Sequence, residues 1–290
     1  MNTIQSIAFV INLSKPKAKE TAEALSVLAE AKGIQTKHIT EFPFNKELFE
    51  SIDLCCVIGG DGTLLGVVEA ALEHDTTVLG INLGKLGFLA TFSIEQVKAD
   101  FLNILNGNFS IEKRSVLNCE SGDGQSAYAL NDLVIKENKN RGLIRLKVKS
   151  NLELISEYHC DGLIFATPTG STAYNLSAGG PIISPNVEAI AMTPICPHTL
   201  GNRSVIFDSH NPIEVFFDDS PSQPLITIDG KAKFELKAIS SIQITLSKRQ
   251  FKLIQNSNNS HFSVVRSKLN WGDPTICLLY TSDAADEHTG

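Results

Sequence analysis

Apolar residues follow two different patterns along this chain. In the first third, short continuous apolar runs, each typical of a strand covered on both faces, are separated by longer stretches of helix-forming residues. The apolar runs are residues 7–13, 54–58 and 77–81, and the helical stretches are residues 14–31, 63–74 and 93–105. Pro16 is expected in the first turn of the first helix, and Ser93 is expected to cap the third. Strands that alternate with helices predict parallel βαβ units, and therefore an α/β domain over residues 1–110.

The pattern changes after about residue 110, where short β-rich segments follow one another. Turn signals such as Asp229-Gly230 separate them, and only residues 172–178 have a helical composition. The segments are residues 127–135, 143–148, 153–159, 162–166, 205–207, 213–217, 225–228, 242–246 and 251–254. Many short strands separated by turns predict a mostly antiparallel β-sandwich, which we place at residues 111–255, with the domain boundary near Ile111.

Composition and charge restrict the classes of function. The chain has 290 residues, of which 42% are hydrophobic and 20% are charged, as expected of an ordered, soluble protein with room for two domains. Its net charge of −7 argues against a broad nucleic-acid-binding face, which needs a basic stripe. No apolar run approaches the ~20 residues that span a membrane. No basic residue precedes the first apolar run, so we do not expect a signal peptide.

The cysteines and the last residues need separate interpretations. The six cysteines, at positions 55, 56, 119, 160, 196 and 277, show no paired metal-binding spacing. We interpret them as buried free thiols of a cytoplasmic protein rather than as a disulfide framework. Residues 277–290 resemble the translated read-through of a transposon-type sequencing adapter, so we interpret them as not native and leave them out of the fold prediction.

The glycine-rich segment GGDGT, residues 59–63, directly follows an apolar run and precedes a helix. Ligands of α/β sheets bind at the carboxyl ends of strands, where glycines let the backbone approach and helix N-termini hold phosphate oxygens. A carboxylate repels phosphate, so Asp61 needs a chemical reason. It would accept the proton of an attacking hydroxyl or hold Mg²⁺ between phosphates. The alternative is a tight turn in which Asp61 caps the helix. The segment fits neither a Walker A loop nor G-x-G-x-x-G.

Two further segments have the composition of ligand-binding loops. NLGKLGFL, residues 82–89, follows a predicted strand, and its Phe88 would pack either under an adenine or in the core. DGLIFATPTGSTAYNLSAGGP, residues 161–181, is rich in hydroxyls and small residues, which is typical of a polar pocket with close backbone approach. A Ser/Thr-rich turn is the alternative. The G-x-S-x-G of a serine hydrolase is absent.

Together these segments resemble the NAD kinase family, which makes NADP from NAD. The resemblance extends from about residue 7 to residue 272. It rests on GGDGT (59–63), NLGKLGFL (82–89), ALNDLVI (129–135), DGLIFATPTGSTAYNLSAGGPI (161–182) and PICPHTL (194–200), in this order. GGDGT also occurs in lipid kinases of the diacylglycerol kinase type, whereas the long TPTGSTAYNLSAGGP block is specific to NAD kinases.

The resemblance implies a Rossmann-like α/β N-terminal domain and a C-terminal β-sandwich, with NAD in the crevice between them. It implies that residues 256–276 pack back onto the first domain. The phosphoryl donor would be ATP or inorganic polyphosphate, together with a divalent metal such as Mg²⁺. The protein would be a homodimer or homotetramer in which a neighbouring subunit helps to close the site.

Residue by residue, the resemblance assigns Asp61 as the general base, which accepts the proton of the adenosine 2′-hydroxyl as that oxygen attacks the γ-phosphorus. Asn131 and Asp132 would bind the ribose and adenine side of NAD. The other residues expected to contact the ligands are Gly60, Gly62, Thr63, Asn82, Gly84, Phe88, His159, Asp161, Thr172, Ala173, Tyr174, Ser177 and Lys231. No residue is assigned as a metal ligand.

The chain departs from the family pattern at several of these positions. Asp132 stands where the family usually has Glu, so its side chain is one methylene shorter. His159 replaces an Arg of some bacterial members, which would make a phosphate contact there pH-dependent. Gly142 occupies a position that is often basic. Lys231 replaces a frequent glutamine and would pair with the new phosphate or face water. Residues 201–204 read GNRS instead of SNRP. Asp61 and the glycine loops are intact, so activity is expected.

Two other functions remain open at this point. A lipid kinase would share GGDGT, but the chain has no amphipathic basic helix that would favour a membrane surface. A non-catalytic sensor of NAD or NADP would keep the binding pocket, but such a protein gains nothing obvious from a carboxylate beside phosphates. Catalytic turnover distinguishes the enzyme from the sensor.

Overall fold

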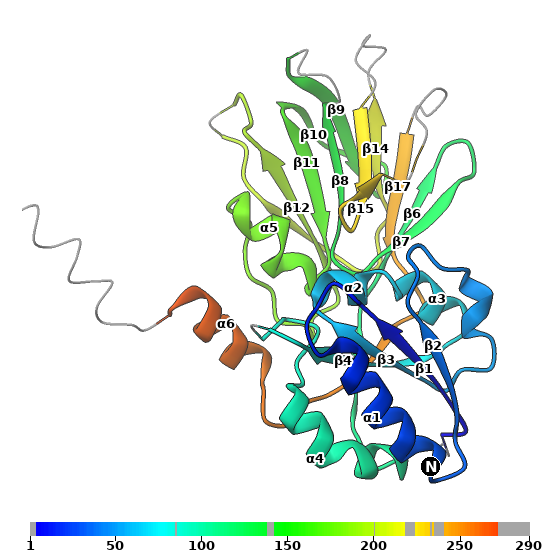
Figure 1. Cartoon of the computed structure of the whole chain (residues 1–290). Coiled ribbons are helices and arrows are strands. Elements are labelled where there is room, and N and C mark those ends of the chain that lie inside the picture. Colours follow the sequence, from blue (N-terminus) through cyan, green and yellow to red (C-terminus); the bar gives the residue numbers. More distant parts are fainter. Residues whose placement is uncertain are drawn as a thin grey trace, which may run out of the picture.

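The computed structural model of the chain describes residues 4–84, 86–137, 142–199, 201–217, 224–232, 234 and 241–271. Within these residues the strands form three six-stranded sheets. One sheet belongs to an α/β domain, and the other two form a β-sandwich next to it (Figure 1). The two-domain architecture predicted from the sequence is therefore confirmed, and the junction between the domains carries the candidate site.

The α/β domain contains six strands and several helices. The strands are β1 (Ser6–Ile11), β2 (Gln35–Ile39), β3 (Leu54–Gly59), β4 (Thr77–Asn82), β5 (Ile111–Arg114) and β18 (Phe251–Ile254). The helices are α1 (Ala18–Glu30), the 3-10 helix η1 (Lys46–Phe49), α2 (Asp61–Leu65), α3 (Val68–Glu73) and α4 (Ile94–Leu105). In the order β2-β1-β3-β4-β18-β5, every neighbouring pair is parallel except β18 and β5.

Both faces of this sheet are covered, as the continuous apolar runs predict. Alternate residues of β1 point to opposite faces: Phe9 packs with α1 and α4, whereas Val10 packs with α2 and α3. Ser93 caps α4 in a capping box with Gln96, which confirms the predicted start of this helix.

Two helix predictions are wrong in detail. Helix α1 begins at Ala18, so Pro16 lies outside it, in a turn that ends at Lys17 with a left-handed φ of 64°. The predicted helix over residues 63–74 is divided into α2 and α3, with Gly66 between them. Glycine has a low helix propensity, which fits a break at this position.

The strand of residues 251–254 was expected in the sandwich, and this prediction is wrong. This strand, β18, pairs with β4 and β5 in the sheet of the α/β domain. Strand β5 follows the expected boundary near Ile111 and also belongs to this sheet. Phe251 packs on one face of the sheet and Ile254 on the other, so the strand needs a sheet that is covered on both sides.

The sandwich consists of two mostly antiparallel sheets. One has the strands β10 (Glu153–Cys160), β9 (Ile144–Ser150), β14 (Ile213–Phe217), β17 (Ser241–Leu246), β6 (Leu117–Ser121) and β7 (Ser126–Ala129), in spatial order. The other has β13 (Val205–Asp208), β12 (Ala189–Ile195), β11 (Gly162–Ala166), β8 (Asp132–Glu137), β15 (Pro224–Ile228) and β16 (Lys231–Ala232). Buried residues of both sheets, such as Val148 and Phe165, share one core.

The expected helix of residues 172–178 is reduced to short turns. These are the 3-10 turn η2 (Gly170–Thr172) and the single helical turn α5 (Tyr174–Ser177). A final helix, α6 (His261–Leu269), follows β18. Asn256, between β18 and α6, donates hydrogen bonds from Nδ2 to the Thr91 carbonyl (2.7 Å) and to Gln96 Oε1 (3.2 Å), so the start of this C-terminal segment contacts the α/β domain.

The described cysteines are free thiols, and most of them are buried. Cys55, Cys56, Cys119 and Cys160 are buried, whereas Cys196 is exposed, contrary to expectation. Burial raises the pKa of all four buried thiols. Cys277 and the adapter-like residues 277–290 lie outside the described residues. No helix among the described residues has both the length and the apolar character needed to cross a membrane.

Candidate active site

The GGDGT turn connects the end of β3 to the start of α2, at the carboxyl edge of the parallel sheet. A Cβ at Gly59 would lie 2.5 Å from Thr63 Oγ1, so a larger residue does not fit there. Within the described structure, no atom beyond the chain neighbours and the local helix backbone lies within 4 Å of a Cβ built at Gly60 or Gly62. The backbone at these two glycines is therefore open to a ligand.

Asp61, the first residue of α2, is held by the loop that follows β4. Its Oδ2 accepts a hydrogen bond from the backbone N–H of Phe88 (2.8 Å), and its Oδ1 accepts from those of Leu89 (3.2 Å) and Ala90 (2.9 Å). A Cβ at Gly87 would lie 2.0 Å from Asp61 Oδ1. The two glycine-rich segments of the first domain thus meet at one half-buried carboxylate. Asp61 makes no capping hydrogen bond to α2, so the helix-cap alternative is wrong.

Two other side chains fix the shape of these loops. Asn82 Oδ1 accepts from the Gly84 N–H (2.7 Å), and Asn82 Nδ2 donates to the Ala90 carbonyl (3.5 Å). Asn12 Nδ2, beyond the end of β1, donates to Thr63 Oγ1 (3.1 Å). Asn82 and Thr63, both predicted as ligand contacts, therefore have structural partners within the fold.

The second half of the site is the link between β7 and β8. The Asp229 carboxylate accepts three backbone hydrogen bonds from this link, at Oδ2 from Leu130 (2.9 Å) and at Oδ1 from Asn131 (2.8 Å) and Asp132 (3.1 Å). From the other side, Thr167 Oγ1 donates to the Leu130 carbonyl (2.6 Å) and the Thr167 N–H donates to the Asn131 carbonyl (2.9 Å). Asn131 and Asp132 are therefore fixed in position before any ligand binds.

The two carboxylates of this link influence each other. Burial, followed by the nearby charge of Asp229, raises the pKa of Asp132 to about 7, although a hydrogen bond to the Tyr174 backbone opposes the shift. Burial also raises the pKa of Asp229, against the effect of its three backbone hydrogen bonds and of Lys231. Asp132 is thus poised to change its charge near neutral pH.

Most polar side chains of the TPTGSTAYN segment face the interior. Ser171 Oγ donates to the Pro168 carbonyl (2.6 Å), and Asn175 Oδ1 accepts from Thr193 Oγ1 (2.7 Å). A Cβ at Gly170 would lie 2.0 Å from the Asn131 carbonyl oxygen. Ser171 and Asn175 therefore bond within the fold rather than line an open pocket, and Gly170 packs closely against the Asn131 link. The predicted contacts that remain half-buried or exposed are Thr172, Ala173, Tyr174 and Ser177.

The two halves of the site are joined by packing between the domains. Leu130, next to Asn131, belongs to the same buried cluster as Leu64 of α2 and Leu89 of the Asp61-bound loop. Arg114 of β5 is buried, with its side chain only 4% exposed, and its Nη1 lies 3.4 Å from Thr169 Oγ1. The Asp61 loop and the Asn131–Asp132 link therefore meet at the junction between the domains, on either side of one shared buried cluster.

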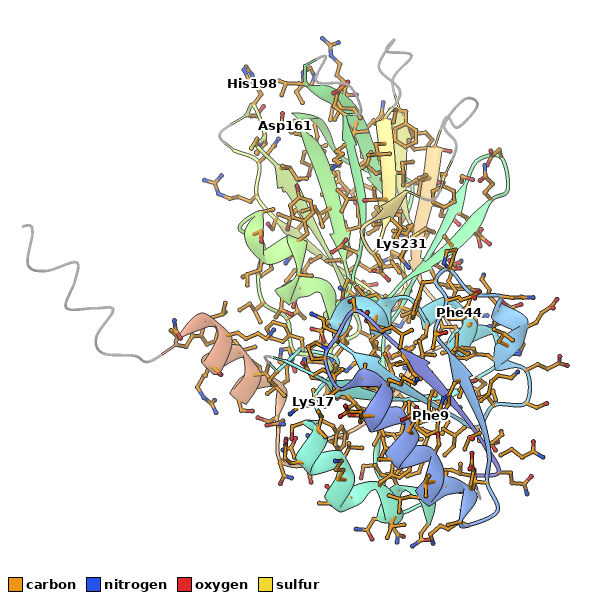
Figure 2. All side chains as sticks on the ribbon, viewed as in Figure 1. Phe9, Lys17, Phe44, Asp161, His198 and Lys231 are labelled. Carbon is orange, nitrogen blue, oxygen red and sulfur yellow. The ribbon has the colours of Figure 1, made fainter. Side chains whose placement is uncertain are left out.

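Two predicted contacts are not brought to this junction. In β11, Ala166 pairs with Asp132 and Gly162 pairs with Lys136, so Asp161 lies beyond the far end of the strand. At about 3.3 Å per residue, β11 separates Asp161 from Thr167 by roughly 20 Å. The His159 carbonyl accepts from the His198 N–H (2.8 Å) at the same end of the sandwich, where Figure 2 shows Asp161 and His198.

Phe88 is not a core residue, which was one of the two alternatives left open, and the adenine contact stays a prediction. It is half-buried, its ring centroid lies 6.1 Å from that of His261, and Lys268 Nζ lies 4.8 Å from the centroid. His261 and Lys268 both belong to α6, so the C-terminal helix covers this phenylalanine. Burial and then the charge of Arg114 lower the pKa of His261, against the effect of Glu112.

Sequence reasoning missed two of the residues that organise the site. Asp229 was interpreted only as part of a turn signal, although it holds the Asn131 link. Arg114 carried no motif, and its buried ion pair with Glu112 (2.9 Å) shows its role only in the structure. Lys231, predicted as a phosphate contact, lies next to α2: a Cβ built at Gly66 would be 3.9 Å from its Nζ.

Comparison with family models matches both domains. Residues 3–109 match the ATP-NAD kinase N-terminal domain, and residues 130–256 match the ATP-NAD kinase C-terminal domain. Among curated proteins, the chain is 33% identical over 283 residues to the NAD kinase of Geotalea daltonii, covering 93% of this chain and all of that protein. It is 36% identical over 273 residues to an NAD kinase of Clostridium perfringens, covering 92% of this chain and 99% of that protein.

Solved structures with a similar fold support the same assignment. A yeast NADH kinase complexed with NADH superposes with a TM-score of 0.85 at 24% identity, over 94% of this chain and 89% of that one. An NAD kinase from Archaeoglobus fulgidus in complex with ATP superposes with a TM-score of 0.77 at 25% identity, over 91% of this chain and 98% of that one. The first likeness shows the shared fold, an α/β domain followed by a β-rich domain.

Proposed function

The chain belongs to the NAD kinase family, and on this premise we propose that Asp61 is the general base of its reaction. The enzyme is a phosphotransferase that makes NADP from NAD and ATP. Neither the lipid kinase nor the non-catalytic sensor is favoured by these relatives. The observation that carries the proposal is the position of one half-buried carboxylate at the junction of two glycine-rich loops.

Among the described residues, three backbone N–H groups donate hydrogen bonds to Asp61, and these leave one position for a substrate. A carboxylate offers about four lone-pair directions, and three are taken by backbone N–H groups. The fourth would accept the hydrogen bond of the adenosine 2′-hydroxyl. As this oxygen bonds to the γ-phosphorus, its proton passes to Asp61, the bond from the γ-phosphorus to the bridging oxygen breaks, and ADP leaves. Phosphoryl transfer depends mainly on positioning and charge stabilisation, so a fixed carboxylate is well suited to it.

We assign the binding of the NAD ribose to the second half of the site. Asn131 and Asp132 are held by Asp229 and Thr167, so they would meet the ligand without losing conformational freedom. With its pKa raised to about 7, Asp132 is roughly half protonated at neutral pH and would either donate to or accept from a ribose hydroxyl. The exposed members of the 172–177 segment would line the dinucleotide.

The metal would enter the site with the donor. Among the described residues no group of three or more His, Cys, Asp or Glu side chains is arranged to hold a metal ion. Mg²⁺ commonly keeps several waters and binds through substrate phosphates rather than in a dedicated protein cage, so it would reach the open glycines beside Asp61 on the donor. Bound in this way, Mg²⁺ would neutralise charge between the phosphates of ATP or polyphosphate.

The distant position of His159 and Asp161 supports an oligomeric enzyme. These residues lie at the opposite end of β11 from the Asn131 link, so they would reach dinucleotide only across a subunit boundary. We therefore propose that the enzyme is a homodimer or homotetramer in which a second subunit contributes them. The buried free thiols are consistent with a cytoplasmic enzyme.

The test is the formation of NADP by the Asp61→Asn variant. The chain truncated after Ile276 is incubated with NAD, ATP and Mg²⁺, and an NADP-specific dehydrogenase reports the product. We expect the variant to lose two to four orders of magnitude in rate, which is the usual contribution of general acid–base catalysis. A variant with undiminished rate would keep the kinase but remove Asp61 from the role of base.

A further inference from the structure

A cavity of the described structure lies between the two domains, next to α2. Its volume is about 520 Å³, within the range of nucleotide and cofactor pockets. The α/β domain contributes residues from the segment before η1 and from α2 and α3. The sandwich contributes Tyr128 of β7, Ile228 of β15 and Lys231 of β16. Such cavities at domain junctions are preferred sites of small ligands.

The walls of this cavity suit a planar base. Phe42, Phe44 and Tyr128 line it, together with aliphatic residues such as Leu65. The Phe42 and Phe44 rings are in edge-to-face contact at 5.8 Å, and Phe44 stacks on Phe49 at 5.5 Å. Phe42 remains 46% exposed although it is a large apolar side chain. Aromatic side chains of this kind stack on nucleobases.

Charged side chains of both signs line the cavity: the lysines Lys46 and Lys231, and the carboxylates of Glu69 and Asp229. Lys231 lies on its rim at the side of α2, close enough that a Cβ at Gly66 would be 3.9 Å from its Nζ. Lys46 also lines the cavity and forms an ion pair with Glu69 (2.8 Å). Figure 2 shows Lys231 at the lower end of the sandwich and Phe44 in the domain below it. Lysine serves as a point charge for phosphate groups.

The cavity lies next to the proposed reaction site. Leu65 and Gly66, which line it, are the last residue of α2 and the residue after it, and Asp61 is the first. A helix of this length rises only about 1.5 Å per residue, so its two ends lie less than roughly 10 Å apart. A triphosphate that runs along α2 from the cavity would therefore reach Asp61.

We propose that this cavity binds the adenosine end of the phosphoryl donor ATP, with the base against Phe42 and Phe44 and the triphosphate passing Lys231. The proposal rests on the kinase function above and adds to it a separate subsite for the donor. NAD would occupy the crevice between Asp61 and the Asn131–Asp132 link. The two adenine-containing substrates would thus be bound on different sides of α2.

The experiment compares the KM values of the two substrates in matched variants. Phe42→Ala removes an aromatic wall, and Leu102→Ala removes a side chain that is also 46% exposed but lies on α4, at the opposite face of the sheet. Stacking on one aromatic side chain corresponds to about a 5-fold to 100-fold change in affinity. We expect Phe42→Ala to raise the KM for ATP by about tenfold or more and to change the KM for NAD less than twofold. Leu102→Ala should change neither the KM for ATP nor the KM for NAD.

Two results would overturn the proposal. An unchanged KM for ATP in Phe42→Ala would show that the base binds elsewhere, and a raised KM for NAD instead would assign the cavity to the dinucleotide. A second measurement does not depend on this variant: the wild-type enzyme is labelled with 2-azido-ATP in the presence of saturating NAD. Labelled peptides should contain residues 42–46 or 65–70, and labelling confined to residues 172–177 would contradict the proposal. Failure of the general-base assignment would appear separately, in the kcat of Asp61→Asn.

Discussion

Two aspartates, Asp61 in the α/β domain and Asp229 in the sandwich, each precede a glycine and each accept three backbone hydrogen bonds from a distant loop. Asp61 holds residues 88–90, and Asp229 holds residues 130–132. The distances are nearly the same, 2.8–3.2 Å in the first case and 2.8–3.1 Å in the second. The same arrangement, an aspartate that accepts three backbone hydrogen bonds, therefore occurs in both domains, on the two sides of their junction.

The surroundings of the two carboxylates differ. Asp61 stands between two glycines whose Cβ positions are open to 4 Å, at the first turn of a helix, where a ligand can approach. Asp229 lies beside a second acid, Asp132, and burial raises the pKa of both. Open glycines on both sides, rather than the pattern of hydrogen bonds, thus distinguish the proposed base Asp61 from Asp229, which holds a loop and lines the cavity beside α2.

The largest effect should come from displacing Asp61 without changing it. In Gly87→Ala the new Cβ would lie 2.0 Å from Asp61 Oδ1, so the carboxylate must move away from its loop. We expect kcat to fall by about 100-fold or more, because misplacement by about 1 Å has a cost of this size. Gly84→Ala is the control in the same loop, since its Cβ would make an ordinary contact of 3.7 Å with Asn82 Oδ1. Equal kcat values for the two variants would contradict the close packing of Asp61.

A smaller effect is expected from the glycines that follow the two aspartates. Gly62 lies in α2 with open space at its Cβ position, so Gly62→Ala should leave the Tm unchanged or slightly raised. Its KM for NAD or ATP should rise about tenfold, because the methyl group takes up space that a ligand needs. Gly230 has a φ of 77°, so Gly230→Ala should destabilise the fold by roughly 1–2 kcal/mol instead. Thermal unfolding and steady-state kinetics of both variants check that Gly62→Ala changes the KM and that Gly230→Ala changes the stability.

The smallest effect concerns Asp132, the acid of the Asn131–Asp132 link that Asp229 holds. Because the folded state raises the pKa of Asp132 from 3.8 to about 7, the folded protein binds more protons than the unfolded chain between these values. The stability that wild type derives from this proton is complete below about pH 4 and is lost as the pH rises through about 7. Asp132→Asn should therefore gain stability relative to wild type over this range, on the order of 1–3 kcal/mol by pH 8.

Urea unfolding of wild type and Asp132→Asn at several pH values measures this difference. Asp75→Asn is a matched control, because Asp75 is an exposed acid whose side chain pairs with Lys252 at the surface. A stability difference between wild type and Asp132→Asn that does not depend on pH would contradict the shifted pKa.

Much of the α/β domain could be predicted from local sequence. The run LCCVI predicts β3 because it is continuously apolar, and Ser93 predicts the start of α4. Strand β2 was not predicted, because most of its side chains are exposed or polar at the sheet edge. The pairing of β18 with β4 joins residues far apart in sequence, so no local pattern shows which sheet it enters.

The site could be predicted only in part, for the same reason. Glycines beside Asp61 mark a candidate ligand loop locally, and the structure places this aspartate against the backbone of residues 88–90. Asp229 and Asn131 are 98 positions apart, so the hydrogen bond between them leaves no signal in either segment. Asp161 stands close in sequence to Thr167, but the extended strand between them carries the two residues to opposite ends of the sandwich.

The measurement that tests the account most directly is kcat for Asp61→Asn beside Asp229→Asn, both checked for folding by circular dichroism. Each variant places an amide where three backbone N–H groups need acceptors, so the two should lose similar stability. We expect Asp61→Asn to lower kcat by about 100-fold to 10,000-fold, and Asp229→Asn to raise the KM for NAD while keeping kcat within about tenfold. Equal losses of kcat in the two variants would show that Asp61 only shapes a loop, and would contradict its role as the base.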